Sequence, residues 1–209
     1  MAAGDPVLEE FLDAVDGIAY IVDAEYRIVA VGRRRWERFA IENDAPELRA
    51  DKIIGRNLFE FMTGPELRQA YRDLADRIVS TGEPAVIAAH CDSPGVAREL
   101  RLSAAPLRLG DKGPGLLFQA QIVSETGRPH LDVFDFRTLL SAIKQEADLP
   151  IVTMCSFCEQ LRRPGSGPGS GDEEEWITAE TYYRLGGSRR VRISHGLCAD
   201  CDAARFPDL

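Results

Sequence analysis

The sequence predicts an α+β fold: a five-stranded antiparallel sheet with helices on one face, then a linking helix and a small module built around four cysteines. Three patterns indicate this class. Apolar residues recur at helical spacing in some segments, they alternate with polar residues in others, and the C-terminal end carries two Cys-x-x-Cys pairs. A chain of 209 residues is long enough for one such domain and a smaller second module.

The first 62 residues are expected to combine helices with a β-hairpin. The N-terminal helix, within residues 1–17, carries an apolar face at helical spacing, made of Val7, Leu8, Phe11, Leu12 and Val15. A helix this short is marginal alone, so it must pack on the domain or on a partner chain. The segments that follow are a strand at 18–22, a strand at 27–31, a helix at 33–42, an irregular polar stretch at 45–54 and one helical turn at 58–61.

The most regular helix is predicted between Thr63 and Gly82. Thr63 and Glu66 fit a capping box, and apolar residues keep helical spacing until Gly82 ends the helix. Three strands then form a meander, at residues 84–91, 98–109 and 116–123. In the last strand, every second residue is expected to point to the buried face. These residues are Leu116, Phe118, Ala120 and Ile122.

Beyond the sheet, a connecting helix is predicted within residues 125–150. Its apolar residues stand at helical spacing, and they are Phe136, Leu139, Leu140 and Ile143. Shorter elements follow at 151–154, 176–177, 178–185 and 190–193. The predicted organisation is an N-terminal helix (1–17), a sheet domain (18–124), the connecting helix (125–150) and a cysteine module (151–209).

Four of the five cysteines fall into two pairs with the same spacing, Cys155/Cys158 and Cys198/Cys201. Two residues between cysteines let a tight turn point both sulfurs at one centre, and two such turns make the tetrahedral pocket of structural zinc. The 39 residues between the pairs include a Gly/Ser/Pro-rich stretch, and loop closure costs little. The pattern predicts a zinc-ribbon-like module, with His195 as an alternative ligand or a residue supporting the site.

The zinc is expected to fold this module, because the tail has too few apolar residues for a core of its own. A thiol redox switch, in which the same pairs form disulfides, is the alternative. The fifth cysteine, Cys91, stands alone near a strand end and is expected to be a packing residue.

Charge and motifs exclude several function classes. The net charge is −9, so nucleic-acid binding lacks its usual basic footprint; a zinc-dependent regulator using Arg189, Arg190 and Arg192 is only a weaker alternative. There is no signal peptide and no apolar stretch long enough to span a membrane, so we expect a cytoplasmic protein. No phosphate loop or catalytic triad appears, and a closed four-sulfur site leaves no position for substrate water, so we expect no enzyme activity.

The order of elements, Asp23 after the first strand, the segment Ile54-Gly55-Arg56-Asn57-Leu58-Phe59 and the closing meander resemble a PAS sensor domain over about residues 7–123. The resemblance implies a sensory or interaction module that binds a small ligand or a protein partner, and a homodimer through the N-terminal helix. Candidates to line a ligand pocket, with ordinary core packing as the other interpretation, are Trp36, Phe39, Leu58, Phe61, Tyr71, Leu74, Leu102 and Phe118.

Departures from the family pattern disfavour two cofactors. Light-sensing flavin members carry a reactive cysteine, whereas this chain has none before Cys91. Haem-binding members supply a histidine from the long helix, and residues 63–81 contain none. The tail, with Trp176 and the segment from Ser194 to Cys201, resembles a cysteine-rich extension found after some bacterial PAS domains.

Overall fold

The computed structural model describes residues 6–42, 45–62, 64–110, 113–135, 138, 149–166 and 174–205. The chain divides into two compact units. The first comprises residues 1–62, 71–88 and 100–123, and the second comprises residues 63–70, 89–99 and 124–209. The domain boundaries expected at residues 17, 124 and 150 remain predictions.

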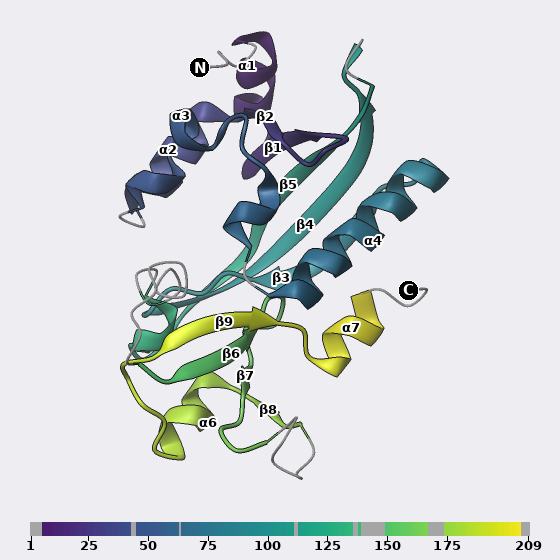
Figure 1. Ribbon diagram of the computed structural model, residues 1–209. Helices are drawn as coiled ribbons and strands as arrows, with labels where there is room; N and C mark the ends of the chain where they lie inside the picture. Colours follow the sequence, from purple (N-terminus) through teal and green to yellow (C-terminus); the bar gives the residue numbers. More distant parts are fainter. Residues whose placement is uncertain are drawn as a thin grey trace. The chain divides into compact units, whose positions relative to one another are not determined.

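The first unit is organised by a five-stranded antiparallel sheet with the strand order β2-β1-β5-β4-β3, which confirms the predicted fold class (Figure 1). Its strands are β1 (Ile18–Asp23), β2 (Ile28–Val31), β3 (Ala85–His90), β4 (Val96–Arg108) and β5 (Pro114–Gly127). The helical elements are α1 (Pro6–Ala14), α2 (Arg33–Glu42), η1 (Pro46–Leu48), α3 (Ala50–Ile53), η2 (Leu58–Phe61) and α4 (Pro65–Thr81).

Strand β1, which pairs with β2 on one side and β5 on the other, has apolar side chains on both faces of the sheet, because its side chains alternate between those faces. Ala19 and Ile21 pack with Leu12 of α1, which is fully buried. Tyr20 points to the other face, where it lies opposite Phe118 of β5 in register. The N-terminal helix therefore packs on its own domain through Leu12, a residue expected on the partner-binding face.

Two local predictions in the first unit are wrong, and a third is not tested. The stretch 45–54 is not irregular: it forms η1 and α3, and the Glu37 carboxylate accepts the N–H of Ala50 at the start of α3. Ile122 is 52% exposed, because β5 continues to Gly127 beyond the part covered by other elements. The capping role predicted for Thr63 lies outside the described residues, although Gly82 ends α4 with a φ of +75° as expected.

The second unit contains a four-stranded sheet of its own, with the order β8-β7-β6-β9. The strands are β6 (Ile151–Cys155), β7 (Leu161–Arg162), β8 (Trp176–Ile177) and β9 (Arg192–Gly196). The helical elements are η4 (Asp132–Phe134), α6 (Ala179–Arg184) and α7 (Ala199–Arg205). Thr178 caps α6 by accepting the N–H of Thr181, as the expected helix at 178–185 requires.

The expectation that the tail lacks its own core is wrong. Eleven buried apolar residues form one cluster in this unit: Leu131, Val133, Phe134, Val152, Met154, Leu161, Ile177, Ala179, Tyr182, Val191 and Ile193. Three of them come from the segment 131–134, which lies before the expected module begins. Apolar burial therefore stabilises this unit together with whatever the cysteines bind.

The core residues expected for the connecting helix, Phe136, Leu139, Leu140 and Ile143, lie outside the described residues. Across the described part of the chain, no helix combines the length and the apolar character needed to cross a membrane.

Candidate functional site

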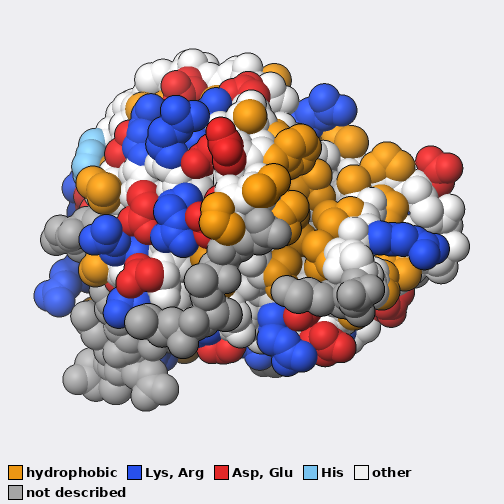
Figure 2. Space-filling view, turned by 90° about the horizontal axis from the view of Figure 1, so that it is seen from above, with side chains coloured by type: hydrophobic (Ala, Val, Ile, Leu, Met, Phe, Trp, Pro, Cys, Tyr) orange, Lys and Arg blue, Asp and Glu red, His pale blue; other side chains and the backbone are white. Residues whose placement is uncertain are grey.

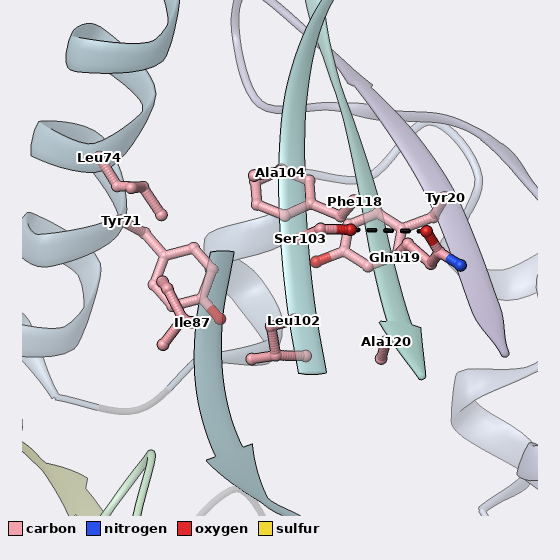
Figure 3. A pocket seen from close by; sticks show the side chains of 10 residues that line it. All are labelled: Tyr20, Tyr71, Leu74, Ile87, Leu102, Ser103, Ala104, Phe118, Gln119 and Ala120. Carbon is pink, nitrogen blue, oxygen red and sulfur yellow. Dashed lines mark hydrogen bonds between the residues drawn. The ribbon is translucent and has the colours of Figure 1, made fainter. Parts of the chain in front are cut away.

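A cavity of about 40 Å³ lies in the first unit between the sheet and α4 (Figure 3). Strands β1, β3, β4 and β5 and helix α4 all contribute to its wall. The lining residues are Tyr20, Tyr71, Leu74, Ile87, Leu102, Ser103, Ala104, Phe118, Gln119 and Ala120. None of these ten side chains is charged, so the cavity is predominantly apolar.

Aromatic stacking fixes the two tyrosines of the cavity. The Tyr20 ring stacks on Phe118 with 5.1 Å between ring centroids, and the Tyr71 ring lies 6.2 Å from the same Phe118 ring. Burial raises the pKa of Tyr71 to about 12 and raises the pKa of Tyr20 well above its usual value. Both hydroxyls therefore stay neutral at physiological pH and offer hydrogen bonds without charge.

The other polar side chains of the wall are bonded to neighbouring residues. The Ser103 hydroxyl lies 3.5 Å from Gln119 Oε1, as the dashed line in Figure 3 marks. Gln119 Nε2 donates to the carbonyl of Asp16 at 2.7 Å. The two tyrosine hydroxyls add further neutral hydrogen-bonding groups to the wall.

Four of the eight pocket candidates line this cavity: Tyr71, Leu74, Leu102 and Phe118. The other four lie outside its lining. Trp36 donates its indole N–H to the carbonyl of Leu48 and lies edge-on to Tyr20, and Phe39 lies 6.3 Å from the Trp36 ring. Leu58 is buried in η2, and Phe61 packs beneath the guanidinium of Arg56.

Sequence reasoning missed six residues of the cavity wall: Tyr20, Ile87, Ser103, Ala104, Gln119 and Ala120. Tyr20 lies in a run of apolar residues whose alternation does not tell which face is buried, and its pairing with Phe118 joins positions almost one hundred residues apart. Ile87 could have been predicted from the alternation in β3, in which Ala85, Ile87 and Ala89 are buried.

The second candidate site is the cluster of cysteines, which the parallel pairing of β6 and β9 brings together. Cys155 ends β6 opposite Gly196, which ends β9. Strands that run side by side in one direction deliver the following residues to the same end of the sheet. The turn from Cys155 to Cys158 and the turn from Cys198 to Cys201 therefore start next to each other, joined by the bond from the Ser156 N–H to the Gly196 carbonyl.

The four sulfurs fit one tetrahedral ion. All lie within 4.8 Å of one another, and Cys158 Sγ and Cys198 Sγ are 3.7 Å apart. Four sulfurs at the usual zinc distance would be separated by about 3.8 Å. Cys155, Cys198 and Cys201 are buried and Cys158 is half-buried, so a bound ion would be shielded from water.

Hydrogen bonds already favour thiolate at this cluster. The Cys158 thiol and several backbone N–H groups, including that of Cys198 at 3.5 Å, point at Cys155 Sγ and lower the pKa of Cys155 to about 4. The hydrogen bond to Cys155, and after it burial, raises the pKa of the Cys158 thiol, because that thiol is the donor to the Cys155 thiolate. The Cys201 N–H donates to Cys198 Sγ at 3.4 Å. N–H groups aimed at sulfur are what a metal-bound thiolate requires.

His195 is not part of the donor group. Among the described residues, the metal-ligating atoms that converge are the four sulfurs alone. Burial lowers the pKa of His195, so its imidazole is neutral at pH 7. His195 lies in β9, where it pairs with Met154 of β6, one residue before Cys155. It therefore lies beside the cluster, and a role in supporting the site is the interpretation that remains.

A buried ionic network holds the first cysteine turn. The backbone N–H of Asp92 donates to both carboxylate oxygens of Glu159, at 3.2 and 3.0 Å. Glu159 has a φ of +56°, which is uncommon for a residue with a side chain. Burial, and after it the charge of Asp92, raises the pKa of Glu159 to about 8. Arg128 contacts Asp92 and so completes the network.

The arginines considered for nucleic-acid binding do not act as one positive track. Arg189 pairs with Asp132 at 3.3 Å and lies over the Tyr183 ring. Arg192 is half-buried in β9, whereas Arg190 is exposed. The prediction against nucleic-acid binding is unchanged.

The sequence matches one family model, described as PAS fold, over residues 12–126. No curated protein matches the sequence.

Several solved structures match part of the chain at low identity. VqmA from Vibrio cholerae, in a complex with ligand and DNA, is 15% identical over 57% of this chain and 51% of that chain, with a TM-score of 0.41. The PAS domain of BvgS from Bordetella pertussis is 15% identical over 56% and 85%, with a TM-score of 0.41. A domain of an HTR-like protein from Haloarcula marismortui is 14% identical over 51% and 97%, with a TM-score of 0.37. The chain spans about half the length of VqmA.

Proposed function

This chain belongs to the PAS family, and we propose that it is a non-catalytic sensory protein whose sheet receives a small neutral ligand and whose cysteine cluster holds a structural zinc ion. The observation that carries the ligand half is the cavity between the sheet and α4, with two neutral tyrosine hydroxyls and no charged residue in its wall. The observation that carries the zinc half is the convergence of four sulfurs.

The chemistry of the wall supports a neutral ligand. Burying an unpaired carboxylate or ammonium in an apolar site costs far more than burying a hydroxyl or carbonyl that finds a hydrogen-bond partner. Tyr20 and Tyr71 can each donate or accept one such bond. The ligand class is therefore a largely apolar molecule with one hydroxyl, carbonyl or similar group.

The size of the cavity supports a small ligand. At about 40 Å³ it has room for roughly three water-sized volumes, whereas an engineered cavity that binds benzene measures about 150 Å³. A larger molecule, including a four-carbon alcohol, would enter only if side chains of the wall moved apart. Haem and photoactive flavin are both much larger than this cavity. Its size therefore supports the prediction that the chain binds neither of them.

The test compares a neutral molecule with its charged counterpart. Isobutanol and isobutyrate have nearly the same shape, so NMR titration of each against the full chain isolates the effect of charge. We expect isobutanol to shift signals of Tyr71 and Phe118, and isobutyrate to leave them unchanged. Ala104→Leu, which fills the cavity from β4, should abolish the isobutanol shifts. Equal responses to both molecules would refute the neutral-ligand proposal.

The donor set supports zinc over a redox pair as the function of the cluster. When bound, zinc cross-links the two turns and stabilises the thiolate form of all four cysteines. The residues Cys155, Cys158, Cys198 and Cys201 would hold it, with the N–H groups of Cys198 and Cys201 supporting the sulfurs. Zinc analysis and the behaviour of single cysteine variants test this assignment.

The redox switch remains a second candidate because of one distance. Cys158 Sγ and Cys198 Sγ, 3.7 Å apart, would need to approach to about 2.05 Å to form a disulfide between the two turns. Peptide mapping after mild peroxide treatment separates the candidates. A zinc-loaded cluster should resist oxidation, whereas a switch should yield the bond between Cys158 and Cys198 first.

We propose that two copies of the chain pair through α1 and that the state of the cavity is passed to a protein partner in the cytoplasm. Val7 and Phe11 support the pairing, since they are 75% and 60% exposed on a helix whose other face is buried. Figure 2 shows hydrophobic side chains gathered in one patch on the face of the molecule that it views. The cytoplasm is proposed because its reducing conditions would keep the four clustered cysteines available as zinc ligands.

A further inference from the structure

The start of α4 lies against the segment that leads into the second cysteine turn. A Cβ atom built on Gly64 would lie 2.3 Å from the carbonyl oxygen of His195, well inside van der Waals contact. Gly64 also has a φ of +94°, a conformation that favours glycine. His195 stands three residues before Cys198, so this backbone contact fixes the approach of the chain to the cluster.

The same helix reaches the cavity. Tyr71 lies seven residues after Gly64, which is two helical turns or about 10 Å along the axis. Leu74 follows one turn later, and both side chains line the cavity. A helix is stiff over this length, so a displacement at its first turn moves residues in the next turns.

Strand β3 provides a second continuous connection. Ile87 lines the cavity, and three residues later the N–H of His90 donates to the carbonyl of Phe157 at 2.6 Å. Phe157 is buried between Cys155 and Cys158 in the first cysteine turn. The bond from the Asp92 N–H to Glu159 follows immediately and holds the residue after Cys158. Each cysteine turn is therefore held by an element that also forms part of the cavity wall.

We propose that the cavity and the cysteine cluster are energetically coupled through α4 and β3, so that metal occupancy changes the stability of the cavity wall and a cavity ligand changes metal retention. This inference rests on the proposed function, because it needs both a metal at the four sulfurs and a ligand-accepting cavity. Coupling between two sites is reciprocal, so either direction can be measured.

Hydrogen exchange in the full chain tests the coupling without any substitution. The zinc-loaded protein is compared with the protein stripped by a chelator, and exchange is followed by mass spectrometry in peptides of α4 and β3. We expect stripping to speed exchange at Tyr71 to Leu74 and at Ile87 by about fivefold or more. Helix α2 of the same unit is part of neither connection and should change little.

Three outcomes would overturn the inference. Faster exchange confined to residues 151–205 would show that the cluster acts locally. A uniform increase in exchange rate that includes α2 would show that stripping lowers the stability of the whole unit, and would not show a specific connection through α4 and β3. A chain that takes up no zinc would remove the inference and the zinc half of the proposed function together, whereas the first two outcomes leave that function standing.

A pair of glycine variants gives an independent test. Gly64→Ala introduces a side chain against the His195 carbonyl, and Gly82→Ala introduces the same strain at the other end of α4, where nothing lies within 4 Å. We expect Gly64→Ala to release zinc to a chelator about fivefold faster than Gly82→Ala. Equal release rates in the two variants would contradict the role of α4.

Discussion

Arg128 and Asp92 form a buried ion pair, with Nη1 of the arginine 2.5 Å from Oδ2 of the aspartate. The two side chains are only 11% and 6% exposed. Arg128 also donates to the carbonyl of Ser93 and lies over the Phe134 ring at 4.0 Å. Because the Asp92 N–H in turn holds Glu159, this pair supports the turn that carries Cys155 and Cys158.

Arg128→Met should destabilise the second unit by about 3–5 kcal/mol, because it leaves the Asp92 carboxylate buried without its partner. Urea unfolding followed by Trp176 fluorescence, in a Trp36→Phe background, measures the loss. Arg38→Met is the matched control, since Arg38 forms an exposed pair with Glu42 and should cost less than about 1 kcal/mol. Equal losses would contradict the account of the network.

Phe118→Ala should destabilise the first unit by about 3–5 kcal/mol, because the ring stacks on Tyr20 and is 9% exposed. Ile122→Ala on the same strand removes a side chain that is 52% exposed and should cost within about 0.5 kcal/mol. Urea unfolding followed by Trp36 fluorescence, in a Trp176→Phe background, compares the two. A smaller loss for Phe118→Ala than for Ile122→Ala would show that the cavity wall is not a packed core.

Cys91 should react slowly with iodoacetamide at pH 8, because burial and the Glu159 carboxylate raise its pKa to about 11 from an ordinary value of 9.0. The folded pKa lies above the unfolded one, so the stability linked to this thiol is complete below about pH 9 and is lost as the pH rises through 11. Mass spectrometry of alkylated peptides from pH 7 to 11 gives the titration. Modification of Cys91 at the rate of an unfolded thiol at pH 8 would contradict this environment.

Phe11→Asp should convert a dimer to a monomer, because it places a charge at the exposed apolar face of α1. Light scattering during size-exclusion chromatography measures the mass of each variant. Val86→Asp is the control, since Val86 is 56% exposed on β3, away from α1 in the chain. A wild-type chain that is monomeric at all concentrations would refute pairing through α1.

Local patterns were sufficient to predict most elements of the fold. The stripe in α4, the alternation in β3 to β5 and the spacing of the four cysteines each depend on residues close in sequence, and the structure contains all of them. The segment 45–54 was harder, because its short helices are held by distant groups such as the Glu37 carboxylate. Propensity alone does not register such tertiary support.

The cavity and the buried network were only partly predictable for the same reason. Tyr20 meets Phe118 through a strand pairing between β1 and β5, and Asp92 meets Glu159 across sixty-seven positions. The core of the second unit depends on the segment 131–134, which sequence reasoning assigned to a connecting helix. Spacing rules identify residues that share one element, whereas these contacts join different elements.

The zinc content of the full chain, purified without added metal, tests the central claim most directly. The account predicts about one zinc per chain, released when a thiol-blocking reagent modifies the four cysteines, and retained when Cys91 alone is replaced by serine. A metal-free chain whose second unit is nevertheless fully folded would contradict it.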